Sequence, residues 1–154
     1  MIVISPHSDD ILLGVYSCIK NNEVDYVYFI DFEGDKKREK EARMFCEDMK
    51  IKIINKKKLG KLLSAGETVL IPNPESSHPL HKCVMGWLFM TFKVQYNQVG
   101  FYSTDMDEFW IKLLSNSQRR DKLEMLNKYF PLEKELWENN AKYYLFEGII
   151  EMKR

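Results

Sequence analysis

The sequence has few cysteines, and their placement narrows the classes of protein that it can encode. Three cysteines occur in 154 residues, at Cys18, Cys46 and Cys83, and no two of them form a C-x-x-C pair. Their number and spacing argue against a disulfide framework. Each lies in an apolar, helix-like stretch, so we expect three buried free thiols.

An excess of charge of one sign is also lacking. The chain has 23 Lys and Arg residues against 23 Asp and Glu residues, which gives a formal net charge of zero. This balance argues against a protein that binds nucleic acid by overall electrostatic attraction.

Long hydrophobic runs are absent as well. No uninterrupted apolar stretch approaches the roughly 20 residues that a membrane-spanning helix requires. A strand-like segment begins at Met1, directly before the first motif, so we expect no signal peptide and a cytoplasmic location. No internal repeat, low-complexity segment or linker divides the chain, and its length suits a single domain over residues 1–154.

What the sequence does contain is an alternation of strand-like and helix-like segments. Apolar and β-branched runs predict strands at 1–5, 24–31, 51–54, 68–71 and 98–104, and helical periodicity predicts helices at 11–20, 36–49, 78–93 and 118–129. Four further segments are assigned more loosely: 56–58 as an exposed charge run, 109–114 as a strand or helix, 131–140 as a helix and 143–150 as an apolar segment that closes the domain. The alternation indicates βαβ units, and therefore an α/β fold with a mostly parallel sheet.

The three histidines are scarce but informatively placed. His7, His78 and His81 fall in two short loops, each of which follows a predicted strand, and Asp9 and Asp10 share the first loop. Active sites of parallel sheets form at the carboxyl ends of the strands. Both loops therefore open onto the same edge of the sheet, where their side chains can meet.

Imidazole and carboxylate side chains in two such loops suit Zn²⁺, or another divalent ion such as Fe²⁺. Two histidines and one aspartate would supply three protein ligands, leaving a second carboxylate and a third histidine for acid–base chemistry. Each residue also has a structural interpretation. Asp9 or Asp10 could cap the helix that follows, His7 could be a hydrogen-bonded turn residue, and His81 could be a residue of a first helical turn. The joint pattern favours the metal site.

These motifs resemble the PIG-L/LmbE-like family, which includes zinc-dependent N-acetylglucosaminyl deacetylases. Ser5-Pro6-His7-Ser8-Asp9-Asp10 is similar to the family's A-H-P-D-D-E loop, and His78-Pro79-Leu80-His81 is similar to its H-P-D-H motif. Weaker similarities to the family's R-x-x-E-x-x-x-A helix, K-x-x-A-L-x-x-Y helix and terminal A-E-x-F element occur at 38–42, 122–129 and 146–147.

The resemblance implies a Rossmann-like, three-layer α/β sandwich, and it implies a role for each site residue. His7, Asp10 and His81 would be the metal ligands. Asp9 would be the general base that activates water, and His78 would stabilise the oxyanion or protonate the leaving amine. The implied reaction removes an N-acetyl or other N-acyl group from an amino sugar or its conjugate, a small-molecule substrate.

Two positions depart from the family's pattern. Ile11 and Leu80 stand where the family has acidic residues, and neither side chain can ligate or take a proton. They motivate an alternative, a degenerate member that binds a sugar- or nucleotide-like ligand without turnover. A third hypothesis is hydrolysis of another acylated amine, such as a modified nucleoside.

The chain is short for this family, which predicts a smaller or more open pocket, or one completed by a second subunit of a homo-oligomer. Tyr102 and Trp110 are candidates for contact with a sugar ring, with core packing as the competing interpretation.

Overall fold

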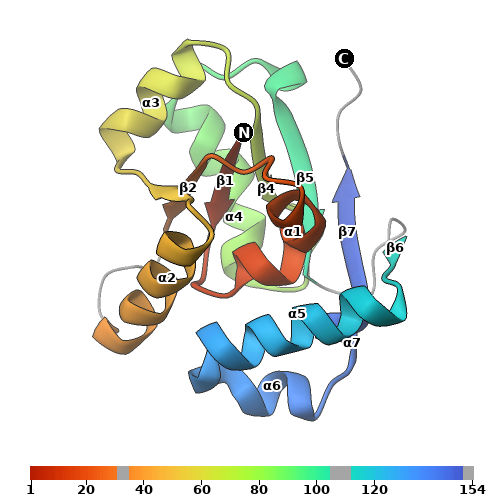
Figure 1. Cartoon of the computed structure of the whole chain (residues 1–154). Coiled ribbons are helices and arrows are strands. Elements are labelled where there is room, and N and C mark those ends of the chain that lie inside the picture. Colours follow the sequence, from red (N-terminus) through yellow and green to blue (C-terminus); the bar gives the residue numbers. More distant parts are fainter. Residues whose placement is uncertain (31–34, 105–111, 151–154) are drawn as a thin grey trace.

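The computed structural model describes residues 1–30, 35–104 and 112–150, and a single seven-stranded sheet lies at its centre (Figure 1). The strands are β1 (Ile2–Ser5), β2 (Tyr26–Phe29), β3 (Lys52–Ile53), β4 (Val69–Pro72), β5 (Val99–Ser103), β6 (Lys112–Leu113) and β7 (Phe146–Ile150). Most of them coincide with the predicted apolar runs, because strands buried on both faces of a sheet need apolar side chains in both directions.

The strand order is β3-β2-β1-β4-β5-β7-β6. The first five strands of the chain pair in parallel, whereas β7 pairs antiparallel with both β5 and β6. The fold is therefore α/β and Rossmann-like with a mostly parallel sheet, as the sequence predicts. The chain moves outward from β1 to β3 and then returns to the other side of β1 with β4. That reversal creates a topological switch point between β1 and β4, the place where such sheets form ligand sites.

Helices cover both faces of the sheet. The longer ones are α1 (Asp10–Lys20), α2 (Lys36–Asp48), α3 (Lys56–Ser64), α4 (Pro79–Thr91) and α5 (Asn116–Tyr129). The shorter ones are η1 (Tyr96–Gln98), η2 (Pro131–Glu133), α6 (Lys134–Glu138) and α7 (Lys142–Leu145). No helix in the described part of the chain is long and apolar enough to cross a membrane.

Alternate side chains of β1 are buried in two separate hydrophobic cores, one on each face of the sheet. Val3 packs with buried residues of α1, α2 and α5, while Ile2 and Ile4 pack with buried residues of α3 and α4. This alternation is the period of two that a strand imposes on its side chains. The result is three layers, with α4 behind the sheet in Figure 1.

The C-terminal part of the described chain is held to α1 by buried polar contacts. Glu147 of β7 accepts hydrogen bonds from the backbone N–H of Ser17 (2.6 Å) and from its hydroxyl. The buried amine of Lys122 donates to the carbonyls of Leu13 (2.7 Å) and Phe146 (2.9 Å). The apolar segment at 143–150 thus closes the domain as short helix α7 and strand β7.

Several predictions are revised by the structure. Cys18 and Cys46 are buried and belong to no disulfide, as expected, but Cys83 is exposed because its position on α4 faces away from the sheet. Lys56 already belongs to α3, since the side chain of Asn55 caps that helix by accepting the backbone N–H of Lys58 at 2.9 Å. The prediction of a helix over 131–140 is met by η2 and α6 rather than by one helix.

Candidate metal centre

The two histidine loops meet at the switch point of the sheet. β1 ends at Ser5 and α1 begins at Asp10, while β4 ends at Pro72 and α4 begins at Pro79. Because β1 and β4 are adjacent and parallel, the loops after them leave the same edge side by side. The proline at the first position of α4 suits a helix start, because the missing N–H would have had no helical partner.

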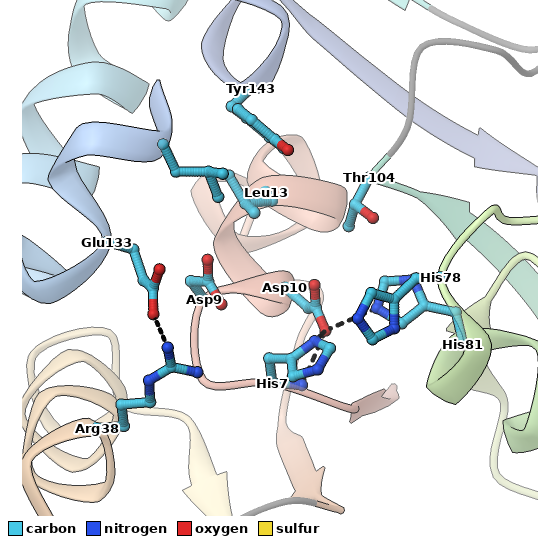
Figure 2. Close-up of a pocket in the computed structure, with 11 residues that line it drawn as sticks. His7, Asp9, Asp10, Leu13, Arg38, His78, His81, Thr104, Glu133 and Tyr143 are labelled. Carbon is cyan, nitrogen blue, oxygen red and sulfur yellow. Dashed lines mark hydrogen bonds and ion pairs between the residues drawn. The ribbon is translucent and has the colours of Figure 1, made fainter. Parts of the chain in front are cut away.

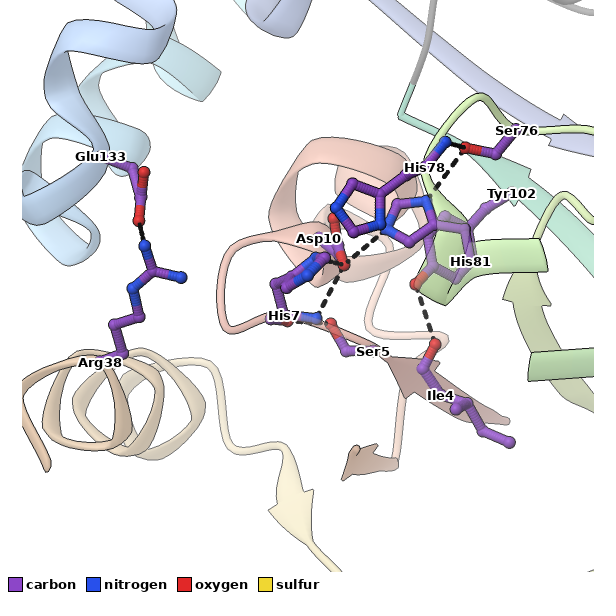
Figure 3. A network of polar contacts seen from close by, with 10 residues as sticks. All are labelled: Ile4, Ser5, His7, Asp10, Arg38, Ser76, His78, His81, Tyr102 and Glu133. Carbon is purple, nitrogen blue, oxygen red and sulfur yellow. Dashed lines mark hydrogen bonds and ion pairs between the residues drawn. The ribbon is translucent and has the colours of Figure 1, made fainter. Parts of the chain in front are cut away.

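The Asp10 carboxylate lies between histidines from both loops (Figure 3). Its Oδ2 atom accepts the backbone N–H of His7 at 2.8 Å and lies 3.0 Å from His7 Nδ1. The same oxygen lies 3.2 Å from Nε2 of His81, which is 71 residues away in sequence. The ring of His78 completes the group, with centroids 4.7 Å from that of His7 and 4.8 Å from that of His81.

This arrangement has the donors and the spacing that a divalent ion requires. One nitrogen from each of His7, His78 and His81 lies within 4.8 Å of the other two. Two ligands bound at zinc distances in a tetrahedral site lie roughly 3.4 Å apart. The Asp10 oxygen lies close to this distance from both His7 and His81. The residues therefore fit a metal ion, and which three of the four are its ligands stays a prediction.

The two aspartates of the first loop have opposite electrostatic environments. Burial raises the pKa of Asp10, but hydrogen bonds with His7 and His81 outweigh burial and hold it well below its usual range. Burial raises the pKa of Asp9 to about 7, and the nearby Asp10 charge adds to this effect. One carboxylate is thus kept ionised by its neighbours, while the other is poised to exchange a proton.

The capping interpretation of these aspartates does not hold. Asp9 occupies the N-cap position of α1, yet its side chain makes no capping hydrogen bond. Asp10 is the first residue of the helix, and its carboxylate turns back to the N–H and ring of His7. Both buried carboxylates are therefore directed to the site rather than to the backbone of the helix.

Two residues outside the predicted set support the centre from behind. The hydroxyl of Ser76 lies 3.3 Å from Nδ1 of His81 and accepts the backbone N–H of His78 at 3.2 Å. A hydrogen bond at Nδ1 leaves Nε2 of His81 directed at Asp10. Tyr102 is fully buried beneath the loop and donates to the carbonyl of Ile4 at 2.8 Å. Tyr102 is therefore a core residue and not a sugar contact.

A cleft of about 250 Å³ opens above these residues (Figure 2). Its lining comprises His7, Asp9, Asp10, Leu13, Arg38, His78, His81, Thr104, Glu133, Leu136 and Tyr143. Across Asp9 from the histidines, Arg38 of α2 forms an ion pair with Glu133 of η2. The cleft thus has a cluster of imidazoles on one side and a charged pair on the other.

All five predicted site residues, His7, Asp9, Asp10, His78 and His81, line this cleft. Ile11 and Leu80, which stand where the resembled family has acidic residues, do not line the cleft. Ile11 has no exposed surface and packs in the core, and Leu80 is not among the lining residues. Trp110 lies outside the described residues.

Sequence reasoning missed Ser76, Glu133 and Tyr143 as neighbours of the site. Ser76 had a signal in its position two residues before His78, at the end of a strand-end loop. Glu133 and Tyr143 had none, because only the docking of η2 and α7 brings them to the cleft.

Comparison with models of known protein families, with curated proteins and with solved structures finds no match for this chain.

Proposed function

We propose that the protein is a metal-dependent hydrolase of the PIG-L/LmbE type that removes an N-acyl group from an amino sugar or a conjugate of one. The observation that carries the proposal is the meeting of His7, Asp10, His78 and His81 around one point at the β1/β4 switch point. These residues come from two loops separated by about half the chain, and the contact between Asp10 and His81 joins the two loops.

The donor set supports zinc or ferrous iron. Imidazole and carboxylate are ligands that both ions accept. When bound, such an ion supplies Lewis acidity, which acidifies a water and polarises a carbonyl group.

The remaining residues can then supply the proton transfers of amide hydrolysis. Asp9 is buried beside Asp10 and lines the cleft, so its carboxylate is placed to accept a proton from the attacking water. His78 is the most exposed of the three histidines and stands at the cleft wall, where it can donate a proton to the departing amine. Asp10 orients His7 and His81 through its hydrogen bonds.

The cleft itself favours a small polar substrate. Its volume of about 250 Å³ lies just below the usual range for ligand pockets, and charged and imidazole side chains line it together with Leu13, Leu136 and Tyr143. Because Ile11 and Leu80 do not line it, neither of them places an apolar side chain on the wall of the cleft. This supports turnover over the alternative of ligand binding alone.

The test is a metal and activity assay on matched variants. Purified protein is expected to retain about one equivalent of zinc or iron and to release acetate from N-acetylglucosamine or its conjugates. Asp9→Ala should abolish acetate release while keeping the metal, and His81→Ala should lose the metal. Glu67→Gln, which changes an exposed carboxyl group that does not line the cleft, is the control.

Three outcomes would contradict the proposal. Wild-type protein without bound metal, or acetate release that survives Asp9→Ala, would refute the mechanism. If only the double variant Ile11→Glu/Leu80→Asp releases acetate, the alternative is favoured, in which the natural protein binds its ligand without hydrolysing it.

A further inference from the structure

Charge is segregated along this electrically neutral chain. Residues 50–104 contain eight lysines and only two acidic residues, whereas the rest of the chain has 15 basic and 21 acidic residues. The two acidic residues of this segment are Glu67 and Glu75, and none follows Glu75 before residue 105. A zero net charge therefore conceals a strongly basic region.

Six of these eight lysines lie on α3, on α4 or two residues after α4. α3 and α4 cover the same face of the sheet, and they touch where Phe92 approaches Gly60 and where Lys56 lies 6.0 Å from the ring of Trp87. We define the lysine face as the exposed lysines of α3 and of the α4 region: Lys56, Lys57, Lys58, Lys61, Lys82 and Lys93. The opposite face of the sheet is covered by α1, α2 and α5.

The lysines at the start of α3 do not serve the stability of that helix. Lys56, Lys57 and Lys58 form its first turn, which contains no acidic residue. The positive end of the helix dipole disfavours cations there. Three positive charges in the first turn of α3 are better explained by binding of an anionic partner than by stabilisation of the helix.

Exposed apolar side chains accompany the lysine face. Met90 on α4 is 90% exposed, and Tyr96 on η1 is 59% exposed and stacks on Phe89. The outward side of α4 between Lys82 and Lys93 bears Cys83, Gly86 and Met90 and no charge. Apolar tips are thus bordered by cationic side chains.

We propose that the lysine face docks on the surface of an anionic lipid bilayer. Lysines near such a surface are attracted by its phosphate and carboxylate groups, and Met90 and Tyr96 would enter the interfacial layer between them. This combination distinguishes a bilayer from RNA. Single-stranded RNA needs exposed aromatic planes, whereas Trp87 is stacked on Tyr28 and meets the edge of Phe92. One face of the exposed Tyr96 ring is likewise covered, because it stacks on Phe89. The proposal is independent of the catalytic one.

Vesicle co-sedimentation tests the proposal with the full chain. The protein should sediment with vesicles that contain phosphatidylglycerol and not with vesicles of phosphatidylcholine alone, and added salt should release it. Lys57→Glu/Lys61→Glu should weaken binding to the anionic vesicles by about tenfold or more. Lys37→Glu/Lys40→Glu makes the same charge change on exposed positions of α2 and should leave binding unchanged.

A second pair of variants tests the apolar contribution. Met90→Ser should weaken vesicle binding even at low salt, whereas Met44→Ser, at an exposed position of α2, should not. Equal binding to neutral and anionic vesicles would overturn the proposal. So would an equal loss in the α2 variants, or binding to RNA without binding to vesicles. Circular dichroism of each variant confirms that a loss of binding is not a loss of fold.

Discussion

At the scale of single residues, Gly14 shows how closely the core approaches the site. A Cβ atom at this position would lie 2.2 Å from Cδ2 of Tyr102. The ring cannot withdraw easily, because its hydroxyl is held by the carbonyl of Ile4. The helix that carries Asp10 can therefore lie against β5 only with glycine at this position.

Gly14→Ala should accordingly lower the free energy of unfolding by about 3 kcal/mol, since overpacking of a core costs this much. Urea denaturation followed by circular dichroism measures it. Gly86→Ala is the matched control: no atom lies within 4 Å of a Cβ at that exposed helical position. The control should be neutral, or stabilising by up to about 1 kcal/mol. A Gly14→Ala protein as stable as wild type would contradict the close contact.

Ser76 supports the centre through the ring of His81, and its hydroxyl also accepts the backbone N–H of His78. Ser76→Ala should therefore weaken metal binding by about tenfold or more, because the ring of His81 loses the partner that fixes its orientation. A competition titration with a chromogenic chelator measures the affinity. Ser117→Ala, at an exposed site on α5, should leave it unchanged. Unaltered affinity in Ser76→Ala would mean that the ring is held by packing alone.

The residues of the candidate site were predictable because all of them fall in two short segments of the sequence. Three histidines and two adjacent aspartates in two strand-end loops leave few arrangements once the sheet is parallel. The role of Ser76 was not predictable in the same way, because serine is common in loops and its partner is fixed only by the turn before α4. The exposure of Cys83 depended on which side of α4 faces the sheet, which an almost wholly apolar helix does not reveal.

At the scale of elements, Lys122 links three of them. Its amine extends from α5 to carbonyl groups of α1 and at the start of β7, entirely buried. Burial lowers the pKa of this amine from 10.5 to about 8. Between these two values the unfolded chain binds one proton more than the folded protein does, so stability must rise with pH.

The free energy of unfolding should thus contain a component that increases by about 1.4 kcal/mol per pH unit above pH 8. The range from pH 8 to pH 10 is the useful one, since ionisation of buried tyrosines such as Tyr16, whose pKa burial raises, opposes it at higher pH. Urea denaturation at several pH values measures the slope. Lys122→Met should remove it, and an identical slope in wild type and variant would show that another group is responsible.

The elements themselves were predicted unevenly. β1 and β4 were clear because their apolar runs end in proline or a polar loop. The first turn of α3 was predicted only as an exposed charge run, since a run of lysines is typical of a solvated loop and the capping role of Asn55 carries little weight by itself. β7 was recognisable as apolar, but its antiparallel insertion between β5 and β6 depends on contacts with residues far away in sequence.

At the scale of the whole molecule, metal binding should couple to stability. The four donors come from both sides of the switch point, so an ion that binds them holds the β1 and β4 loops together only in the folded state. At a free concentration of ~100 times the dissociation constant, this adds about 2.7 kcal/mol. For a chain of this length we expect the melting temperature to rise by roughly 5–10 °C.

Thermal denaturation with and without zinc, and after treatment with a chelator, tests this coupling. His81→Ala should melt at the same temperature in all three conditions. A Glu75→Gln control keeps every candidate ligand and should respond to zinc as wild type does. A rise in melting temperature that persists in His81→Ala would indicate that zinc binds elsewhere.

The position of β7 has a consequence for synthesis on the ribosome. The five parallel strands and every donor of the candidate metal centre lie within residues 1–104, so they can associate while later residues are still being made. Until residues 146–150 emerge, however, β5 remains an open edge with unpaired backbone groups. The nascent protein therefore passes through a stage in which the candidate metal centre can be complete while the open edge of β5 can pair with a strand of another chain. Chaperone demand should be greatest during that interval.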